Sequence, residues 1–360
     1  MSDQLLKDYQ SSKNAQTYVA TLKALQTSAP SSVANLLKPI AMDLEKLSNP
    51  ELVSLGNELL GAGLLGSPGL DEETYKICKE LFDIYVARGD FQTAVNFLSK
   101  APLLKDEFKV DQHERFQGIL NLVTANLEIK QSLACEPVLM KAHEMASKIK
   151  DKDLLIQYNY CCGEYYNFSR KYLTAAMRYY SACNIESITL DGDAISNMLS
   201  KAIDTAILAP TGPKKRFLVA NLMKDERAKA FKNYQLLLKI NKEAVVSANE
   251  VEQFCTGLKT HQNMRDKDGF TAAEKVFLEH NIIVLSKVYR DITLESLSDR
   301  LGVRTNEVER ILQDMCGGEK LALQIDHLTG SVRFSSSQSY GETSKQSLGI
   351  FCELLDNLKI

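Results

Sequence analysis

The sequence has no long apolar run, no C-x-x-C pair of cysteines and almost no net charge. No segment approaches the roughly 18–20 consecutive apolar residues that cross a bilayer, and the opening MSDQLLKDYQ lacks the basic-then-apolar layout of a signal peptide. The 43 Lys and Arg residues nearly balance the 46 Asp and Glu residues, so no strong field draws the chain to nucleic acid or to a membrane surface. These absences predict a soluble intracellular protein.

Catalytic and metal-binding motifs are missing as well. The eight cysteines form no C-x-x-C pair and most stand beside apolar residues, which predicts buried, reduced thiols. The five histidines are scattered, and His143 lacks the second histidine of a zinc-protease helix. No serine occurs in G-x-S-x-G. We therefore expect no enzyme activity, no catalytic residue, no metal site and no cofactor.

Three short stretches imitate functional motifs, but their context argues against each. GAGLLG (Gly61–Gly66) spells a dinucleotide fingerprint, yet the preceding ELVSLGNELL is helical in pattern, so a loop between helices is expected. TGPKKR (Thr211–Arg216) lacks the closing G-K-[ST] of a phosphate loop. It is interpreted as a solvated basic turn, with a localisation signal as the weaker alternative. KDER (Lys224–Arg227) is either a charged contact or a solvated helix start, and the latter is favoured.

Helical periodicity is nearly unbroken from about Gln16 to Leu238 and contains a weak repeat. IYVARGDFQTAVNFLSKA (Ile84–Ala101) aligns with YYNFSRKYLTAAMRYYSA (Tyr165–Ala182) at an offset of 81 residues. A poorer copy, NLEIKQSLACEPVLMKAHEMA, lies about halfway between them. The offset is close to two helix-pair repeats of roughly 34–47 residues each. The matched pairs are Phe91 and Tyr172, Ala94 and Ala175, Leu98 and Tyr179, and Ala101 and Ala182. This pattern predicts an N-terminal α-solenoid of TPR- or HEAT-like repeats.

A different pattern begins near Glu274. A helix over 274–289 is expected to bury Val276, Phe277, Ile283, Leu285 and Val288. Thr293 is the expected N-cap of a short helix that ends at Gly302, and Thr305 the expected N-cap of the next. The second of these helices repeats apolar residues at Val308, Ile311, Leu312 and Met315, and Gly317–Gly318 ends it. KLALQID and SVRF then alternate around HLTG, which predicts a two-stranded hairpin. Together these elements predict a winged helix.

The charge of this unit argues against DNA binding. The exposed face of the second helix offers Asn306, Glu307, Glu309, Arg310, Gln313 and Asp314, with three acids against one base. Glu274–Phe334 holds ten acids and eight bases, a net charge of −2. Such a face repels phosphates, where DNA readers need several Lys or Arg contacts. We expect no direct nucleic-acid partner, with a DNA-binding regulator as the disfavoured alternative.

Two segments instead suit protein contacts. The hairpin can serve as a sheet edge whose backbone pairs with another chain, with the candidate residues Leu321, Leu323, Ile325, Val332 and Phe334. The C-terminal SKQSLGIFCELLDNLKI carries an apolar stripe of Leu348, Phe351, Leu355 and Leu358. That helix either folds back on its own domain or joins partner helices, and the stripe favours a shared bundle.

Helical repeats that lead into a winged helix resemble the PCI-domain family of proteasome-lid and signalosome subunits. The strongest likeness lies in ILAPTGPKKRFLVANLMKDERAKAF and in EKVFLEHNIIVLSKVYRDITLESLSDRLGV. The resemblance implies a mainly α fold in three parts. These are a helical-repeat solenoid over 1–180, a PCI domain over 181–337 with its helical part at 181–290 and winged helix at 291–337, and a C-terminal helix over 338–360.

The resemblance also implies a function. It points to a non-catalytic scaffold and substrate-recognition subunit, in the cytoplasm and nucleus, of a complex that removes the ubiquitin-like modifier Nedd8 from cullin-RING ubiquitin ligases. The implied partners are other PCI subunits, a zinc isopeptidase subunit that performs the catalysis, and the cullin-RING ligase as substrate. A PCI subunit of the proteasome lid is the alternative within the family.

Overall fold

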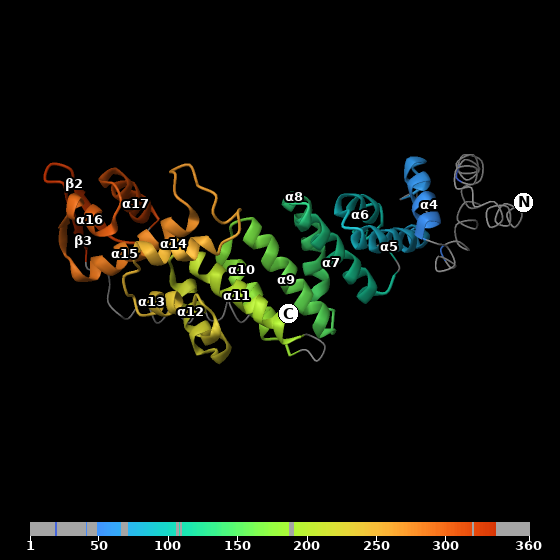
Figure 1. Cartoon of the computed structure of the whole chain (residues 1–360), viewed down its shortest axis with the longest axis horizontal. Helices are drawn as coiled ribbons and strands as arrows, with labels where there is room; N and C mark the ends of the chain where they lie inside the picture. The colour runs from blue at the N-terminus through green and yellow to red at the C-terminus, as the bar shows by residue number, and fades with distance from the viewer. Residues whose placement is uncertain are drawn as a thin grey trace, which may run out of the picture. The chain divides into compact units, whose positions relative to one another are not determined.

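The computed structural model describes residues 19, 41, 49–65, 71–105, 108, 110–186, 191–318 and 320–335. Over these residues the chain is mainly helical with one small sheet, as expected (Figure 1). The chain divides into two units, Met1–Cys161 and Cys162–Ile360, and one helix runs across the division.

The helices before the division are α4 (Asn49–Gly61), α5 (Asp71–Ala87), α6 (Phe91–Leu98), α7 (Gln112–Glu128) and α8 (Ser132–Ala146), and α9 (Lys152–Phe168) crosses it. After it come α10 (Tyr172–Cys183), α11 (Gly192–Leu208), α12 (Pro213–Lys224), the 3-10 helix η2 (Glu226–Ala230), α13 (Tyr234–Asn241), α14 (Ala248–Thr256) and α15 (Ala272–Val288). The last part holds β1 (Asp291–Thr293), α16 (Leu294–Leu301), α17 (Thr305–Gly317), β2 (Leu323–Asp326) and β3 (Ser331–Phe334).

The predicted repeat consists of helix pairs that share one kind of turn. Two residues after the end of each first helix, the chain has a residue with positive φ: Gly89 (78°), Lys130 (60°) and Arg170 (57°). The next N–H donates to the carbonyl five residues earlier, over 3.0, 2.9 and 2.8 Å respectively. This main-chain closure is a helix C-terminal motif that satisfies carbonyls left open at the helix end. The three turns stand 41 and 40 residues apart, which explains both the offset of 81 and the poorer copy halfway.

The second helices of the pairs, α6, α8 and α10, bury equivalent positions. These are Ala94, Cys135 and Ala175; Leu98, Leu139 and Tyr179; and Ala101, Ala142 and Ala182. Small residues at the first and third positions let neighbouring helices approach, as the repeat predicted. In the third pair the two helices approach closely, since a Cβ on Gly163 of α9 would lie 2.5 Å from the ring of Tyr179.

Several side chains differ from expectation. Val288 was expected in the core but is 71% exposed, whereas Ile282 is fully buried. Six residues correspond to about 240° of helical rotation, so the two side chains lie on different sides of α15. Five of the seven described cysteines are buried, as expected, but Cys316 is exposed at the end of α17. Among the described residues, no helix combines the length and apolarity needed to cross a bilayer.

Candidate protein-interaction surface on the winged helix

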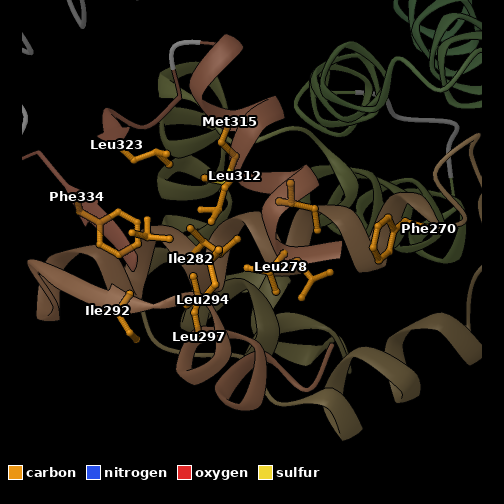
Figure 2. Packing of buried hydrophobic residues seen from close by; sticks show 13 residues of the cluster. Phe270, Leu278, Ile282, Ile292, Leu294, Leu297, Leu312, Met315, Leu323 and Phe334 are labelled. Atoms are coloured by element: carbon orange, nitrogen blue, oxygen red, sulfur yellow. The ribbon is translucent and has the colours of Figure 1, made fainter. Parts of the chain in front are cut away.

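The winged helix and α15 share one hydrophobic core. Leu278 and Ile282 of α15 meet Leu294 and Leu297 of α16 and Leu312 of α17 in this core (Figure 2). The complete buried set is Phe270, Leu278, Ile282, Ile292, Leu294, Leu297, Val308, Ile311, Leu312, Met315, Leu323, Val332 and Phe334. The predicted winged helix is therefore present, and its apolar repeats are buried as the spacing indicated.

Local capping largely follows the sequence. The Thr293 hydroxyl accepts from the Ser296 N–H over 3.2 Å and caps α16, and Gly302 ends that helix with φ of 69°. Thr305, expected as the next N-cap, is instead the first residue of α17. Arg304 holds the cap position in an extended conformation, and its N–H donates to the Glu307 carboxylate over 3.1 Å. The Glu307 carboxylate at N3 thus satisfies the N–H of the cap residue, which is one of the two bonds of a capping box.

The sheet has three strands rather than the expected two, in the order β1-β3-β2. The added strand β1 pairs antiparallel with β3, placing Ile292 opposite Val332 and Asp291 opposite Arg333. The Arg333 guanidinium donates to the Asp291 carboxylate over 2.7 Å on the outer face. Because β3 pairs on both sides, its residues Val332 and Phe334 are central. Of the two hairpin strands, therefore, only β2 lies at an edge of the sheet and can pair with another chain.

The candidate edge residues combine buried side chains with open main-chain groups. Leu323, Val332 and Phe334 are buried in the domain's own core, and Leu321 and Ile325 pack partly against it. The Ser335 N–H donates to the Ala322 carbonyl over 2.9 Å, which makes that pair a hydrogen-bonded one. Antiparallel ladders alternate, so the N–H and C=O groups of Leu323 and Ile325 point away from β3. The Cys316 thiol contacts the Leu323 carbonyl at 4.0 Å. Ile325 is therefore the β2 residue whose outward N–H and C=O are both available to another strand.

The exposed face of α17 is acidic and its single base is already paired. Arg310 lies 3.7 Å from the Asp268 carboxylate, and Lys275 of α15 pairs with Asp314 over 2.7 Å. At the wing, His327 lies 3.5 Å from Glu309. The exposed face of α17 therefore offers phosphates a carboxylate-rich surface.

Four buried polar side chains and the partly exposed Lys320 form a group that we call the polar hub: Lys215, Glu279, His280, Asn281 and Lys320. The Lys320 ammonium donates to both carboxylate oxygens of Glu279 over 2.8 Å, tying the segment before β2 to α15. The Asn281 side chain accepts from the Val246 N–H over 2.9 Å and donates to its carbonyl over 2.8 Å. His280 donates from Nε2 to the Ala244 carbonyl over 2.9 Å. These three consecutive residues fasten α15 to two segments distant in sequence.

Lys215 corrects the interpretation of TGPKKR as a solvated turn. Pro213 begins α12, and the Lys215 side chain turns inward, where it is 4% exposed. Its ammonium donates to the carbonyls of Ile207 and Ala209 over 2.8 and 2.7 Å, at the C-terminal end of α11. Burial is the main cause that lowers the pKa of Lys215 to about 7; Glu279 opposes the shift and Lys320 adds to it.

KDER also differs from the favoured solvated interpretation. The Arg227 guanidinium binds the Asp225 carboxylate and donates to the Cys183 carbonyl and the Asn184 side chain, both over 3.1 Å. It therefore holds η2 on the C-terminal end of α10.

Two other expectations concern regions away from the winged helix. Gly61 ends α4 as the helical context of GAGLLG predicted, although Gly66 lies outside the described residues. The candidate C-terminal residues Leu348, Phe351, Leu355 and Leu358 also lie outside them. Within the described part, no three His, Cys, Asp or Glu side chains are grouped to hold a metal ion.

Helix pairs followed by a winged helix define a helical-repeat protein with a PCI domain, and the PCI domain family matches residues 251–336. The family described as PSMD12/CSN4, N-terminal, matches residues 4–191, more than half of the chain. This protein belongs to the PSMD12/CSN4 family.

Curated relatives agree with this membership. The chain is 26% identical over 293 residues to the COP9 signalosome complex subunit 4 of Arabidopsis thaliana, covering 80% of this chain and 74% of that protein. It is 26% identical over 266 residues to the subunit of the same name in Dictyostelium discoideum, covering 74% and 67%. The Neurospora crassa subunit of that name is 26% identical over 324 residues, covering 88% and 71%.

Proposed function

We propose that this chain is a non-catalytic scaffold and substrate-recognition subunit of a COP9 signalosome, supporting removal of Nedd8 from cullin-RING ubiquitin ligases. The observation that carries the proposal is a winged helix with an open β2 edge and an acidic recognition helix, in a chain of the PSMD12/CSN4 family. An edge strand recruits another strand through main-chain hydrogen bonds, whereas an acidic helix repels DNA.

In this proposal the chain contributes surfaces and another subunit contributes the hydrolysis. The proposal assigns the isopeptide cleavage to a separate zinc isopeptidase subunit, as the family resemblance implies. The helix pairs of the proposed 1–180 solenoid contribute to cullin-ligase recognition, and the PCI domain of 181–337 joins the other PCI subunits. The C-terminal residues Leu348, Phe351, Leu355 and Leu358 are assigned to a helical bundle with those subunits.

The first experiment is gentle affinity purification of the tagged full-length chain from its own cells, followed by sizing and mass spectrometry. Co-elution with a zinc isopeptidase and cullins in one large particle supports the proposal. The N-terminal family description also includes PSMD12, so a PCI subunit of the proteasome lid is the second candidate. Co-elution with proteasome subunits selects that candidate, and a lone monomer overturns both.

The β2 edge has a sharper test in Ile325→Pro. Proline removes an N–H that points away from β3, so the internal ladder stays intact while the edge loses a donor. We expect the variant to keep its helix content and to leave the complex. Ile325→Val retains the donor and is expected to remain in it.

Gln324→Pro is the matched contrast, because its N–H faces Arg333 of β3 within the domain. We expect this variant to lower the thermal stability of the free chain more than Ile325→Pro, which keeps the ladder and loses only partly buried packing. Full retention of the folded Ile325→Pro chain in the particle would exclude β2 as the assembly edge.

A further inference from the structure

The outer face of α8 carries an apolar stripe with no cover among the described residues. Leu133 is 88% exposed, Pro137 is exposed and Met140 is 65% exposed. The three are four and three residues apart, so they line one side of the helix. An exposed stripe of this kind on one face marks a contact surface more often than scattered apolar residues do.

The repeat shows which kind of element covers such a stripe. Aligned on the three left-handed turn residues, the stripe corresponds to Leu173, Met177 and Tyr180 of α10. Those side chains are also large and apolar in character, but they are half-buried. Helix α12 packs against α10, and η2 is fastened to its end by Arg227. In the third pair, helical segments of the same chain therefore pack on α10, and the equivalents of the stripe are half-buried rather than exposed.

The first pair shows what an uncovered outer face looks like. The equivalent positions are Gln92 and Asn96 of α6 and its C-cap residue Ser99, all polar and all exposed. Polar residues on an exposed face and apolar residues under a helix each match their surroundings. Among the second helices of the three pairs, only α8 carries large apolar residues on this face and leaves them exposed.

The charges beside the stripe indicate the chemistry of the missing cover. Glu136 is exposed and forms no ion pair within the described part of the chain, and Glu144 remains 64% exposed although Lys141 pairs with it over 2.9 Å. In α10 the covering segment supplies a guanidinium to the C-terminal carbonyls. The C-terminal end of a helix and nearby carboxylates both favour a cation.

We propose that the Leu133, Pro137 and Met140 face of α8 binds an amphipathic helix of another protein chain, with apolar residues toward the stripe and Lys or Arg beside it. This contact rests on the proposed function only in requiring that the chain belongs to an assembly. It lies on a different helix from the β2 edge, so the two contacts can be tested separately.

The test compares cysteine labelling at Met140→Cys and at the equivalent position of the first pair, Ser99→Cys, both in a Cys316→Ser chain. Each full-length variant is labelled with a maleimide, alone and in the purified complex, and modification of the peptide bearing the new cysteine is followed by mass spectrometry. We expect the complex to slow labelling at position 140 by more than about tenfold, since reaction then requires local opening. Labelling at position 99 should be unchanged.

Equal labelling at position 140 in the free chain and the complex would overturn the inference while leaving the proposed function standing. Slow labelling at position 140 already in the free chain would mean that another part of the same chain covers the stripe. That result would overturn the proposed partner helix. A chain that forms no complex overturns both proposals.

A photo-crosslinking residue at position 140 in the complex then tests the occupant. A cross-link to a segment with apolar residues at helical spacing and flanking Lys or Arg supports the inference. A cross-link to an acidic or non-helical segment overturns it.

Discussion

The turns of the helix pairs and the polar hub hold their helices together by different means. In the turns, main-chain hydrogen bonds close each first helix, and the left-handed position is occupied by Gly89, Lys130 or Arg170 alike. In the hub, each bond depends on one side chain: the Glu279 carboxylate, the Asn281 amide or the Lys215 ammonium.

This difference determines which residue types each feature requires in the sequence. A main-chain closure accepts almost any residue that tolerates or compensates positive φ, so the repeat fades into a weak echo. A buried polar contact requires a partner of matching chemistry, because leaving one group unpaired costs more than the pair contributes. In this sequence three hub residues are consecutive, Glu279, His280 and Asn281, whereas the turns share only a spacing.

The largest expected effect is that of Glu279→Ala. Removing this carboxylate leaves the Lys320 ammonium and the buried Lys215 without their acidic neighbour, so the free energy of unfolding should fall by about 3–5 kcal/mol. Denaturation of the full chain in urea, followed by circular dichroism, measures the change. A loss as small as that of a surface pair would show that the hub is not a structural support.

The matched control is Asp314→Ala, which breaks the exposed pair with Lys275 between α15 and α17. Both ion pairs anchor α15, yet this one is solvated, and we expect a change of less than about 1 kcal/mol.

Lys215→Met tests the hub through pH. Burial lowers the pKa of Lys215 from 10.5 to about 7, so between these values the unfolded chain binds the additional proton. The stability of the natural chain should therefore rise with pH in this range, by up to about 1.4 kcal/mol per pH unit. Below the folded-state pKa both states are protonated and the cost of burying the charge remains in full.

The methionine variant lacks this titration, and its stability should respond less to pH across the same range. Urea denaturation of both chains at about pH 7, 8 and 9 gives the comparison. Parallel pH profiles would mean that Lys215 does not lose its proton in the folded chain.

The smallest effects belong to the turns. Gly89→Ala places a Cβ at φ of 78° and should lower the free energy of unfolding by about 1 kcal/mol, whereas Lys130→Gly should raise it by about 0.5–1 kcal/mol. Thermal denaturation of both variants measures the opposite shifts. Equal signs would mean that the two turns are not equivalent.

The sequence predicted elements that rest on local patterns. Thr293, Gly302 and the apolar spacing of α17 define the helix-turn-helix, and each acts within a few residues. The strand β1 was missed because three residues are too few to show an alternation, and it is a strand only through its pairing with β3.

Other features depend on contacts between distant parts of the chain. Burial of Lys215 was missed because its acceptors are carbonyls, which every residue possesses and no motif announces. The edge was placed on the whole hairpin because only the sheet order shows that β3 is central. The stripe on α8 can be compared with α6 and α10 only after the turns have been aligned. The sequence does not mark those turns, because Lys130 and Arg170 stand where the first pair has Gly89.

The separation of Lys320 from Glu279, 41 residues in the chain, also has a consequence for synthesis on the ribosome. Each helix pair of the repeat closes within its own stretch of chain and can form soon after it emerges. Helix α15 emerges with a carboxylate on its inner face whose lysine has not yet been made. The winged helix therefore completes its attachment to α15 only after its own second helix has been translated.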